Sequence, residues 1–284
     1  MLFSSQKNEK IGNGMNVLLL LKIIIPVLFV VLIIGFVILE IIKPKTKGYK
    51  LEDVEKVKLV REYADDTVVE KMDTVLFGSY PQSDASGNIK DPIEWIVLDR
   101  KDNKALLMSK YILDCKAYEH DKENAKFTYW EVCSLRKWLN EDFYNKAFNN
   151  EEKKKIMPTH LNNEPKRENE YGGNDTDDKI FCLNPNDAIE YFDQPELVAD
   201  KEFNFHRSVA WSTNYAKAVD NFGHHLNIAT EKEKFYKGSS EYWLRMITLG
   251  NHYAAVVCED GVIYGNTDVS NKFTGIRPAL WVEY

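Results

Sequence analysis

The sequence predicts an α+β protein, with a mixed or antiparallel sheet and flanking helices, preceded by one transmembrane helix. Strand-like runs of β-branched and aromatic residues lie near both ends of the region beyond residue 66, and helical patterns occupy its middle. Strands at the ends with helices between them are typical of the α+β class. Upstream, residues 17–42 form an apolar run of 26 residues, and about 20 such residues span a bilayer.

The apolar run divides the chain into four expected parts. Residues 1–16 form a polar tail, 17–42 the span, 43–65 a linker or stalk, and 66–284 one globular domain. The run is too long for a signal peptide and lacks a small-residue cleavage site, so we expect a membrane anchor rather than a cleaved leader. Four lysines follow the span and two precede it, which favours a cytoplasmic domain. Long domains translocate regardless of such counts, so the charges leave the side of the membrane open.

The charge balance excludes one class of partner. The whole chain has a net charge of −7, and residues 1–50 carry +5. Residues 51–284 therefore carry −12. A domain this acidic, without a basic stripe, repels phosphate backbones. We therefore expect no nucleic-acid partner.

The domain's strands and helices follow from local signals. Residues 51–64 fit either a short amphipathic helix or an early strand. The expected strands are 74–78, 93–99, 105–109, 179–183, 253–259, 262–264 and 276–282. The expected helices are 128–140, 142–155 and 184–192, with one helical turn at 215–218.

Turn and cap residues support several of these elements. Residues 101–104 separate two strand-like runs and predict a hairpin, and Asp260-Gly261 predicts a second hairpin with a type I′ turn. Thr128 and Glu131 have the spacing of a capping box at the start of the first helix. Asn184-Pro185 places a proline in the first turn of the third helix.

Metal and cofactor signals are weak. The acidic loop contains oxygen ligands suited to calcium at Asn174, Asp175, Asp177 and Asp178. No register of this loop supplies the glycine and glutamate that an EF-hand needs, so solvated turn residues are the favoured interpretation. The six histidines lack zinc spacing, and no nucleophile or nucleotide motif occurs. We expect no cofactor and assign no catalytic residue.

Aromatic and arginine residues give the only candidates for ligand binding. Trp211, Trp243 and Arg245 flank the long polar loop, where rings stack on sugars or clamp peptides; core packing is the alternative for both tryptophans. A structural role is expected for Arg136, Trp138, Asn140 and Arg277. Buried arginines need partners, and salt bridges to carboxylates would supply them. Cys115 and Cys133 are a possible disulfide pair if the domain faces outward, and free thiols are the alternative.

Several motifs together resemble a known family. They are Val75–Gln82, Ile93–Leu98, Leu113–Cys115, the LRKWLN motif at Leu135–Asn140 with the preceding Cys133-Ser134, and Gly275–Trp281 with its GIRPAL core. The pattern resembles an uncharacterised bacterial domain-of-unknown-function family over residues 66–284, found in surface-associated proteins of anaerobic Gram-positive bacteria. The family has W-L-R-S-P-G where this chain has Trp243–Ile247, so we expect a different turn after Arg245.

That family in turn resembles the C-type-lectin-like fold shared with formylglycine-generating enzymes. The resemblance implies a C-type-lectin-like sheet and display outside the cell. Those oxidases use a closely spaced cysteine pair that binds copper, whereas Cys115 and Cys133 are 18 residues apart. We expect a single-pass membrane-anchored protein that displays a domain for an unknown protein, peptide or glycan ligand. The alternatives are a membrane-anchored oxidase or hydrolase with an unrecognised site, and a scaffold for another membrane protein.

Overall fold

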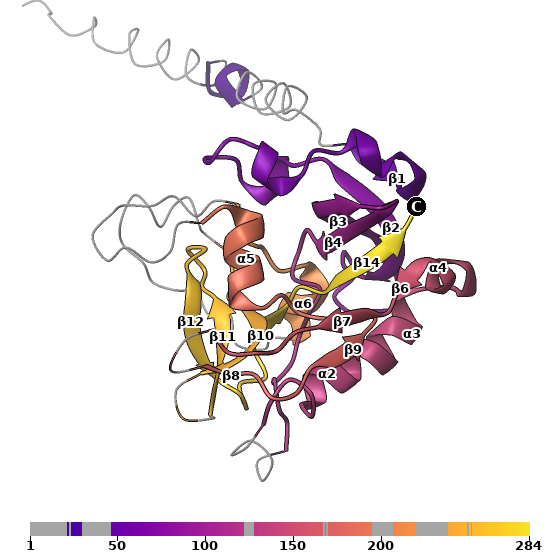
Figure 1. Ribbon diagram of the computed structural model, residues 1–284. Coiled ribbons are helices and arrows are strands. Elements are labelled where there is room, and N and C mark those ends of the chain that lie inside the picture. Colours follow the sequence, from indigo (N-terminus) through magenta and orange to yellow (C-terminus); the bar gives the residue numbers. More distant parts are fainter. Residues whose placement is uncertain are drawn as a thin grey trace, which may run out of the picture. The chain divides into compact units, whose positions relative to one another are not determined.

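The computed structural model describes residues 22, 24–29, 47–121, 128–166, 168, 170–194, 207–219, 238–248, 250 and 252–284 (Figure 1). The chain divides into two compact units, Met1–Lys45 and Thr46–Tyr284. In the first unit, residues 24–29 are helical and exposed. The rest of the expected span at 17–42, apart from Lys22, lies outside the described residues. Across the described part of the chain, every helix is too short or too polar to cross a bilayer.

Two sheets and one ribbon form the second unit, and the predicted α+β class is confirmed. The first sheet has the order β1-β2-β3-β4-β14-β6. Its strands are β1 Gly48–Lys50, β2 Thr74–Pro81, β3 Lys90–Lys101, β4 Lys104–Ser109, β14 Ala279–Glu283 and β6 Ile156–Met157. The second sheet has the order β12-β11-β10-β13-β5, and β8 also pairs with β10. Its strands are β12 Ile263–Asp268, β11 Tyr253–Val257, β10 Tyr242–Thr248, β13 Gly275–Ile276, β5 Asp114–Cys115 and β8 Glu170–Tyr171.

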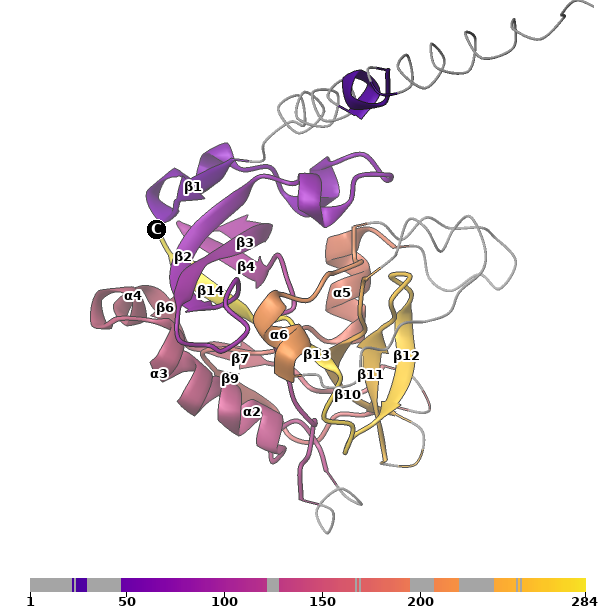
Figure 2. The ribbon, with the colours of Figure 1, turned by 180° about the vertical axis from the view of Figure 1, so that it is seen from behind.

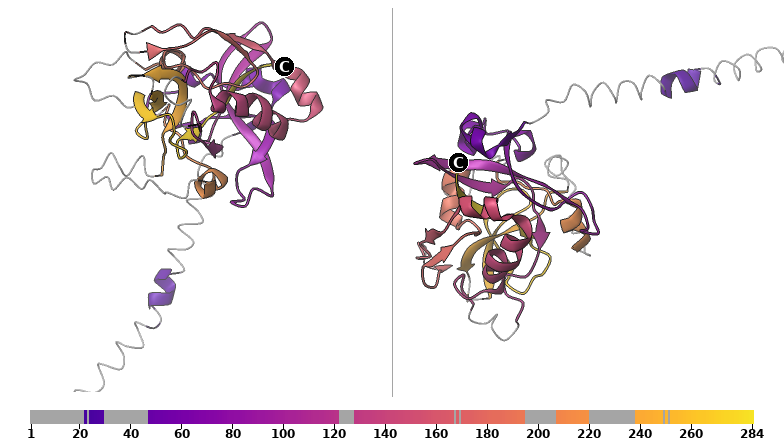
Figure 3. Two further views of the ribbon diagram at one scale, coloured as in Figure 1. Left: turned by 90° about the horizontal axis from the view of Figure 1, so that it is seen from below. Right: turned by 90° about the vertical axis from the view of Figure 1, so that its right-hand side faces the viewer.

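The separate ribbon pairs β7 Thr159–Leu161 with β9 Thr176–Asp178 in antiparallel register. In Figure 1 it lies between helix α5 Pro185–Phe192 and helix α2 Ser134–Trp138. The remaining helices are α3 Tyr144–Ala147, α4 Asn150–Lys155 and α6 Asn214–Val219, with a π-helical segment, η5, at Leu139–Phe143. Seen from the right of Figure 1, the continuous helix from α2 to α3 lies in front of the strands (Figure 3).

The unit begins earlier than the expected start at residue 66. Strand β1 pairs in parallel with β2, and two 3₁₀ helices follow at η1 Leu51–Lys56 and η2 Val60–Glu62. A third, η3, spans Val69–Lys71. Leu51 and Val54 are buried on one face of η1, because a spacing of three residues matches the 3₁₀ repeat. Val57, just after η1, and Val60, at the start of η2, are buried as well. The expected stalk at 43–65 therefore contributes buried side chains to the core from Leu51 onward.

The hairpin of β3 and β4 forms as predicted. Asp102 and Asn103 have φ angles of 53° and 57°, as a two-residue type I′ turn requires. The second hairpin, β11–β12, differs from the expectation of such a turn at Asp260-Gly261. Only Gly261 has a positive φ, at 87°, while the Cys258 amide donates to the Val262 carbonyl oxygen. The loop is therefore a three-residue type with one left-handed glycine.

The expected strand at 276–282 is divided between the two sheets. Ile276 in β13 pairs with Asp114 of the second sheet, whereas Ala279 in β14 pairs with Met108 of the first sheet. Pro278 has no amide hydrogen for a ladder, so pairing is interrupted between the two strands. Figure 2 shows β13 and β14 following one another along the end of the chain.

The helices also start and stop at other residues than expected. Helix α2 starts at Ser134 with Cys133 as its N-cap, whose Sγ accepts from the Arg136 amide at 3.4 Å. Thr128 and Glu131 lie before this helix and do not form the expected capping box. The helix expected at 142–155 is broken, since Asn149 caps a new helix, α4, with Glu152. Residues 179–183 form no strand beyond a bridge from Phe181 to Ala279.

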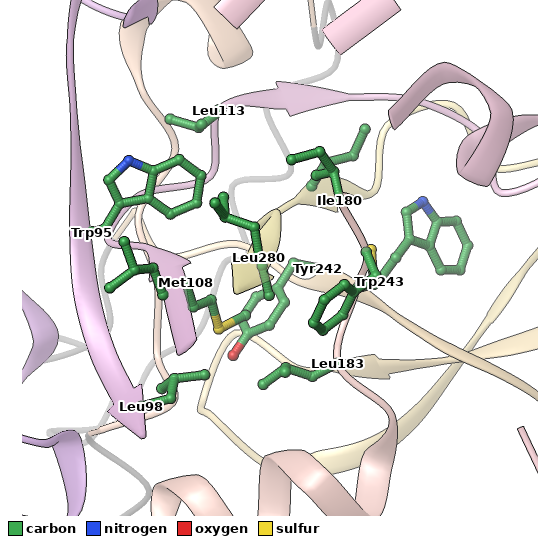
Figure 4. Close-up of a cluster of buried hydrophobic side chains, with 14 of the residues drawn as sticks. Trp95, Leu98, Met108, Leu113, Ile180, Leu183, Tyr242, Trp243 and Leu280 are labelled. Carbon is green, nitrogen blue, oxygen red and sulfur yellow. The ribbon is translucent and has the colours of Figure 1, made fainter. Parts of the chain in front are cut away.

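Helix α5 is where the sequence predicts it. Asn184 accepts from the amides of Asn186 and Asp187, and Pro185 occupies the first turn. The core between the sheets contains side chains from both, as Figure 4 shows. The labelled residues are Trp95, Leu98, Met108, Leu113, Ile180, Leu183, Tyr242, Trp243 and Leu280.

Candidate functional site

The first candidate site, here called the Arg245 pocket, is a cavity of about 310 Å³. Its lining comes mainly from α5 and the residues before it and from the segment that begins with β7, with Trp281 added by β14. Residues 159–166 supply six of its lining residues. The lining residues are Leu106, Thr159, His160, Leu161, Asn162, Glu164, Lys166, Phe181, Leu183, Asn184, Asp187, Tyr191, Arg245 and Trp281.

Arg245 is fixed by three different partners. Its Nε donates to Asn163 Oδ1 at 3.2 Å, Nη1 to the Cys182 carbonyl oxygen at 3.0 Å, and Nη2 to Asp187 Oδ2 at 3.0 Å. The guanidinium carbon also lies 5.8 Å from the centre of the Phe181 ring. Only 3% of Arg245 is exposed. The charge is therefore paired and rigid at the base of the cavity.

Asp187 carries the oxygen that is left for a ligand. It occupies the third position of α5, where its Oδ2 accepts from Arg245 and, at 3.4 Å, from the Asn184 amide. Its Oδ1 accepts no hydrogen bond from the described residues. The side chain is 37% exposed. Asp187 thus presents one oriented acceptor whose charge is offset by Arg245.

Aromatic rings line the same cavity. Tyr191 lies one helical turn after Asp187, and Trp281 of β14 also lines the cavity. Both rings are partly buried. Burial first, and then the nearby charge of Asp187, raises the pKa of Tyr191 to about 12. Its phenol is therefore neutral near pH 7 and keeps a proton that it can donate.

The β7–β9 ribbon forms one wall of the Arg245 pocket. The His160 side chain lies between two carboxylates, that of Asp177 in β9 and that of Asp175 just before β9. Its Nδ1 lies 3.0 Å from Asp177 Oδ1, and its Nε2 lies 3.4 Å from Asp175 Oδ2. The bond to Asp177 is the main cause of a raised pKa for His160. This contact makes the wall sensitive to protonation.

A second cavity, here called the Arg136 pocket, has a volume of about 470 Å³. Its base is the pair formed by Arg136 Nε and Asp178 Oδ1 at 2.7 Å. The Nη2 of Arg136 has no hydrogen-bond partner among the described residues. The lining residues are Glu131, Val132, Cys133, Arg136, Lys137, Asn140, Glu141, Pro158, Asp177, Asp178 and Lys179.

Three of the four residues weighed as possible calcium ligands contact other side chains. Asp178 is buried and accepts from Trp130 Nε1 at 2.8 Å and Thr176 Oγ1 at 2.9 Å, in addition to Arg136. Asp175 and Asp177 flank His160. Within the described residues, no group of three or more acidic, histidine or cysteine side chains is placed to hold a metal ion. The calcium alternative at Asn174, Asp175, Asp177 and Asp178 therefore has no support from the geometry.

Of the three expected ligand-binding residues, only Arg245 lies in either cavity. Trp243 is fully buried against Tyr118, and its indole nitrogen donates to the Lys116 carbonyl oxygen at 2.8 Å. This corrects the expectation of a surface ring, since β10 is covered on both faces. Trp211 is partly buried and pairs with Ser239 through a backbone bridge, away from both cavities.

Asn140 and Trp138, which are expected to be structural, each contact a different segment of the chain. Asn140 Oδ1 accepts from the amides of Lys179 and Ile180, and its Nδ2 donates to the Ile180 carbonyl oxygen at 2.9 Å. Trp138 is partly buried beneath the Lys116 ammonium, 4.8 Å from its ring centre.

Arg277 corrects the expectation that all three arginines form salt bridges. Arg136 and Arg245 do, with Asp178 and Asp187. Arg277 is completely buried and donates to carbonyl oxygens of Ser109 and Ser208. No carboxylate of the described residues lies within ion-pair distance of it. Burial lowers its pKa from the usual arginine range.

The expected disulfide between Cys115 and Cys133 is not formed. Cys133 is a buried thiol that donates to the Trp130 carbonyl oxygen at 3.4 Å and caps α2. Burial raises its pKa, and burial also raises the pKa of Cys182 to about 12. Both thiols are therefore protonated near pH 7, unlike a nucleophilic cysteine.

Sequence reasoning missed most of the Arg245 pocket. Asp187 and Tyr191 share a face of a correctly predicted helix, since residues four apart are neighbours on its surface. This spacing can be seen in the sequence and would have placed the two side chains together. His160 and Trp281 carry no such pattern, because they meet α5 only through tertiary packing.

Comparison with known proteins identifies the domain but not its activity. Residues 102–284 match the family described as "Domain of unknown function (DUF6273)". No curated protein and no solved structure matches the chain. The match covers more than half of the chain and includes α2, β10, β14 and the Arg245 pocket. The chain belongs to the DUF6273 family of domains of unknown function.

Proposed function

We propose that this is a single-pass membrane-anchored protein whose domain binds a ligand or protein in the Arg245 pocket. The observation that carries the proposal is Asp187, which is held by Arg245 at 3.0 Å and whose second oxygen accepts no hydrogen bond within the described part of the chain. Ligand sites are typically concave, largely preformed, and combine apolar or aromatic walls with a few oriented polar groups. The 310 Å³ cavity with Tyr191 and Trp281 in its walls fits this description.

Preorganisation supports binding further. Arg245 has partners on three of its nitrogens, and Asn163, one of those partners, is itself fully buried. A ligand therefore meets polar groups whose conformational entropy is already lost in the free protein, which lowers the cost of association.

A membrane-anchored oxidase or hydrolase is the second candidate. The observation that favours it is the combination of Arg245, a carboxylate and a tyrosine of shifted pKa in one cavity, since such shifts cluster at functional sites. However, the shift of Tyr191 is upward, which weakens it as an acid and keeps it from acting as a base. Cys133 and Cys182 are protonated thiols. Binding therefore has the stronger support.

Anchoring and display rest on the sequence. The apolar run at 17–42 supports one membrane span, and the family resemblance supports a C-type-lectin-like domain outside the cell. Alkaline phosphatase and a cytoplasm-only fluorescent protein, each fused to the C-terminus, report the side of the membrane. We expect phosphatase activity; fluorescence alone would place the domain inside and overturn display.

The binding test uses the full chain in detergent on glycan and peptide arrays, beside an Asp187→Asn variant. We expect a ligand whose signal falls at least tenfold in the variant, because the charged acceptor becomes an amide. Asp102→Asn is the matched control, since it makes the same chemical change in the exposed β3–β4 turn. Ligands that bind both variants equally would show that the Arg245 pocket is not the site.

A further inference from the structure

We propose that the Arg245 and Arg136 pockets are two subsites of one groove that crosses the β7–β9 ribbon, and that its ligand is an uncharged oligosaccharide chain. This inference rests on the proposed function, because it assigns a ligand class to the same site and extends that site. It starts from the position of the ribbon, which contributes lining residues to both cavities.

The two cavities meet at the ribbon. His160 lines the Arg245 pocket and Asp177 lines the Arg136 pocket, yet their side chains are only 3.0 Å apart. Pro158 and Thr159, which are neighbours in the chain, also line different pockets. His160 and Asp177 are 67% and 75% exposed, so the divide between the cavities lies at the surface. A chain-like ligand can therefore pass over the ribbon from one cavity to the other.

The two cavities have the same kind of base. Each contains an arginine paired with an aspartate, Arg245 with Asp187 and Arg136 with Asp178. The other charges around them are of both signs, with Glu164 and Lys166 in one pocket. In the other they are Glu131, Glu141, Asp177, Lys137 and Lys179. Neither pocket thus favours a strongly charged ligand, whose desolvation would not be offset by an opposite net charge.

Hydrogen-bonding capacity remains where the charges are offset. Asp187 Oδ1 can accept from a hydroxyl group, and Arg136 Nη2 can donate to one. Trp281 and Tyr191 provide partly exposed rings in the lining of the same cavity as Asp187, suited to the apolar face of a sugar ring. A polyhydroxylated, uncharged ring satisfies all these groups, and a chain of such rings occupies both subsites.

A peptide fits less well. Peptide affinity depends on aromatic or aliphatic side chains that fill desolvated apolar pockets. Here the base of each cavity is an ion pair, and Val132 at the rim of the Arg136 pocket is 65% exposed rather than part of an apolar hole. The repeated arginine–aspartate base fits a ligand of repeating units.

The test measures how affinity depends on ligand length. The full chain in detergent is titrated with linear oligomers of glucose, mannose, galactose and N-acetylglucosamine, one to six units long. Acidic oligosaccharides and a peptide library are included for comparison. We expect an uncharged series in which affinity rises about tenfold or more between one and four units, because a second subsite adds an intramolecular contact.

Two variants separate the subsites. Val132→Trp fills the Arg136 pocket from an exposed position, so it should remove the gain with length but leave binding of the single unit. Asp187→Asn should weaken both. Ile89→Trp is the matched control at another exposed position, and melting curves confirm folding of each variant.

The outcomes distinguish the two proposals. Binding that depends on Asp187 but not on length or on Val132→Trp overturns the groove and leaves the proposed function standing. The same holds if peptides or acidic oligomers bind in an Asp187-dependent way and uncharged oligomers do not. If nothing binds in an Asp187-dependent way, both proposals fail.

Discussion

The guanidinium carbon of Arg277 lies 4.8 Å from the ring centre of Tyr242, and Arg277 Nη1 donates to the hydroxyl of the same tyrosine at 3.0 Å. Arg277 stands between β13 and β14, whereas Tyr242 begins β10. The contact therefore fixes the position at which the chain passes from one sheet to the other.

Replacing Arg277 by lysine should destabilise the domain. An ammonium cannot reproduce the planar contact with Tyr242 together with the bonds to Ser109 and Ser208. We expect a loss of about 2–4 kcal/mol in the free energy of unfolding, since hydrogen bonds to charged groups are worth about 1.5–3 kcal/mol each. Urea denaturation measures it. Arg61→Lys, at an exposed ion pair with Asp99, should change stability by less than about 0.5 kcal/mol. Equal stability of the two variants would contradict an anchoring role.

Truncation of the two tryptophans that the sequence offers as ligand contacts should lower the stability of the domain by different amounts. Trp243→Ala removes a fully buried ring and should cost about 3–5 kcal/mol. Trp211→Ala removes a partly exposed ring and should cost roughly 1–2 kcal/mol. Denaturation with guanidinium, followed by circular dichroism, gives both values. A milder effect of the Trp243 change than of the Trp211 change would argue against its place in the core.

Gly172 should tolerate no side chain. A Cβ atom there would lie 1.3 Å from the carbonyl oxygen of Asn163, the residue that accepts from Arg245. Gly172→Ala should therefore cost on the order of 2 kcal/mol or more, as backbone shifts in packed regions do. It should also weaken ligand binding. Gly48→Ala is the control, because its Cβ would meet only the partly exposed side chain of Leu76. Thermal melts that rank the two alanines equally would refute the close approach.

The His160 contact should be lost at high pH. Its pKa in the folded state is raised, chiefly by the bond to Asp177, above the usual value of about 6.5. The contact is therefore fully formed below that value and is lost as the pH rises through the folded-state pKa. An NMR titration of the imidazole protons should show a raised midpoint. In Asp177→Asn the midpoint should fall toward the ordinary value, whereas Asp121→Asn should leave it unchanged. Identical midpoints in all three proteins would contradict the contact.

Local chemistry explains the parts of the fold that the sequence predicts well. The β3–β4 hairpin depends on Asp102 and Asn103, and the start of α5 depends on Asn184 and Pro185. Such signals act over a few residues, so they can be read without knowing the tertiary structure. The break between β13 and β14 depends instead on partners in two different sheets, Asp114 and Met108, which no local pattern specifies.

The candidate site shows the same limit. The sequence draws attention to Arg245 because an arginine among apolar residues needs a partner. Its partner Asp187 comes from α5, and the wall at His160 comes from a ribbon earlier in the chain. Pairing across such distances is decided by packing. After Arg245 the chain makes no turn, because Met246 and Ile247 continue β10 and are both buried.

The two-residue link of Arg277 and Pro278 has a mechanical consequence. With β13 paired in one sheet and β14 in the other, and no slack between them, neither sheet can slide or detach without pulling on its neighbour. The two sheets should melt as one cooperative block. Any motion that admits a ligand must then come from elements outside this block, such as the three-pair ribbon of β7 and β9.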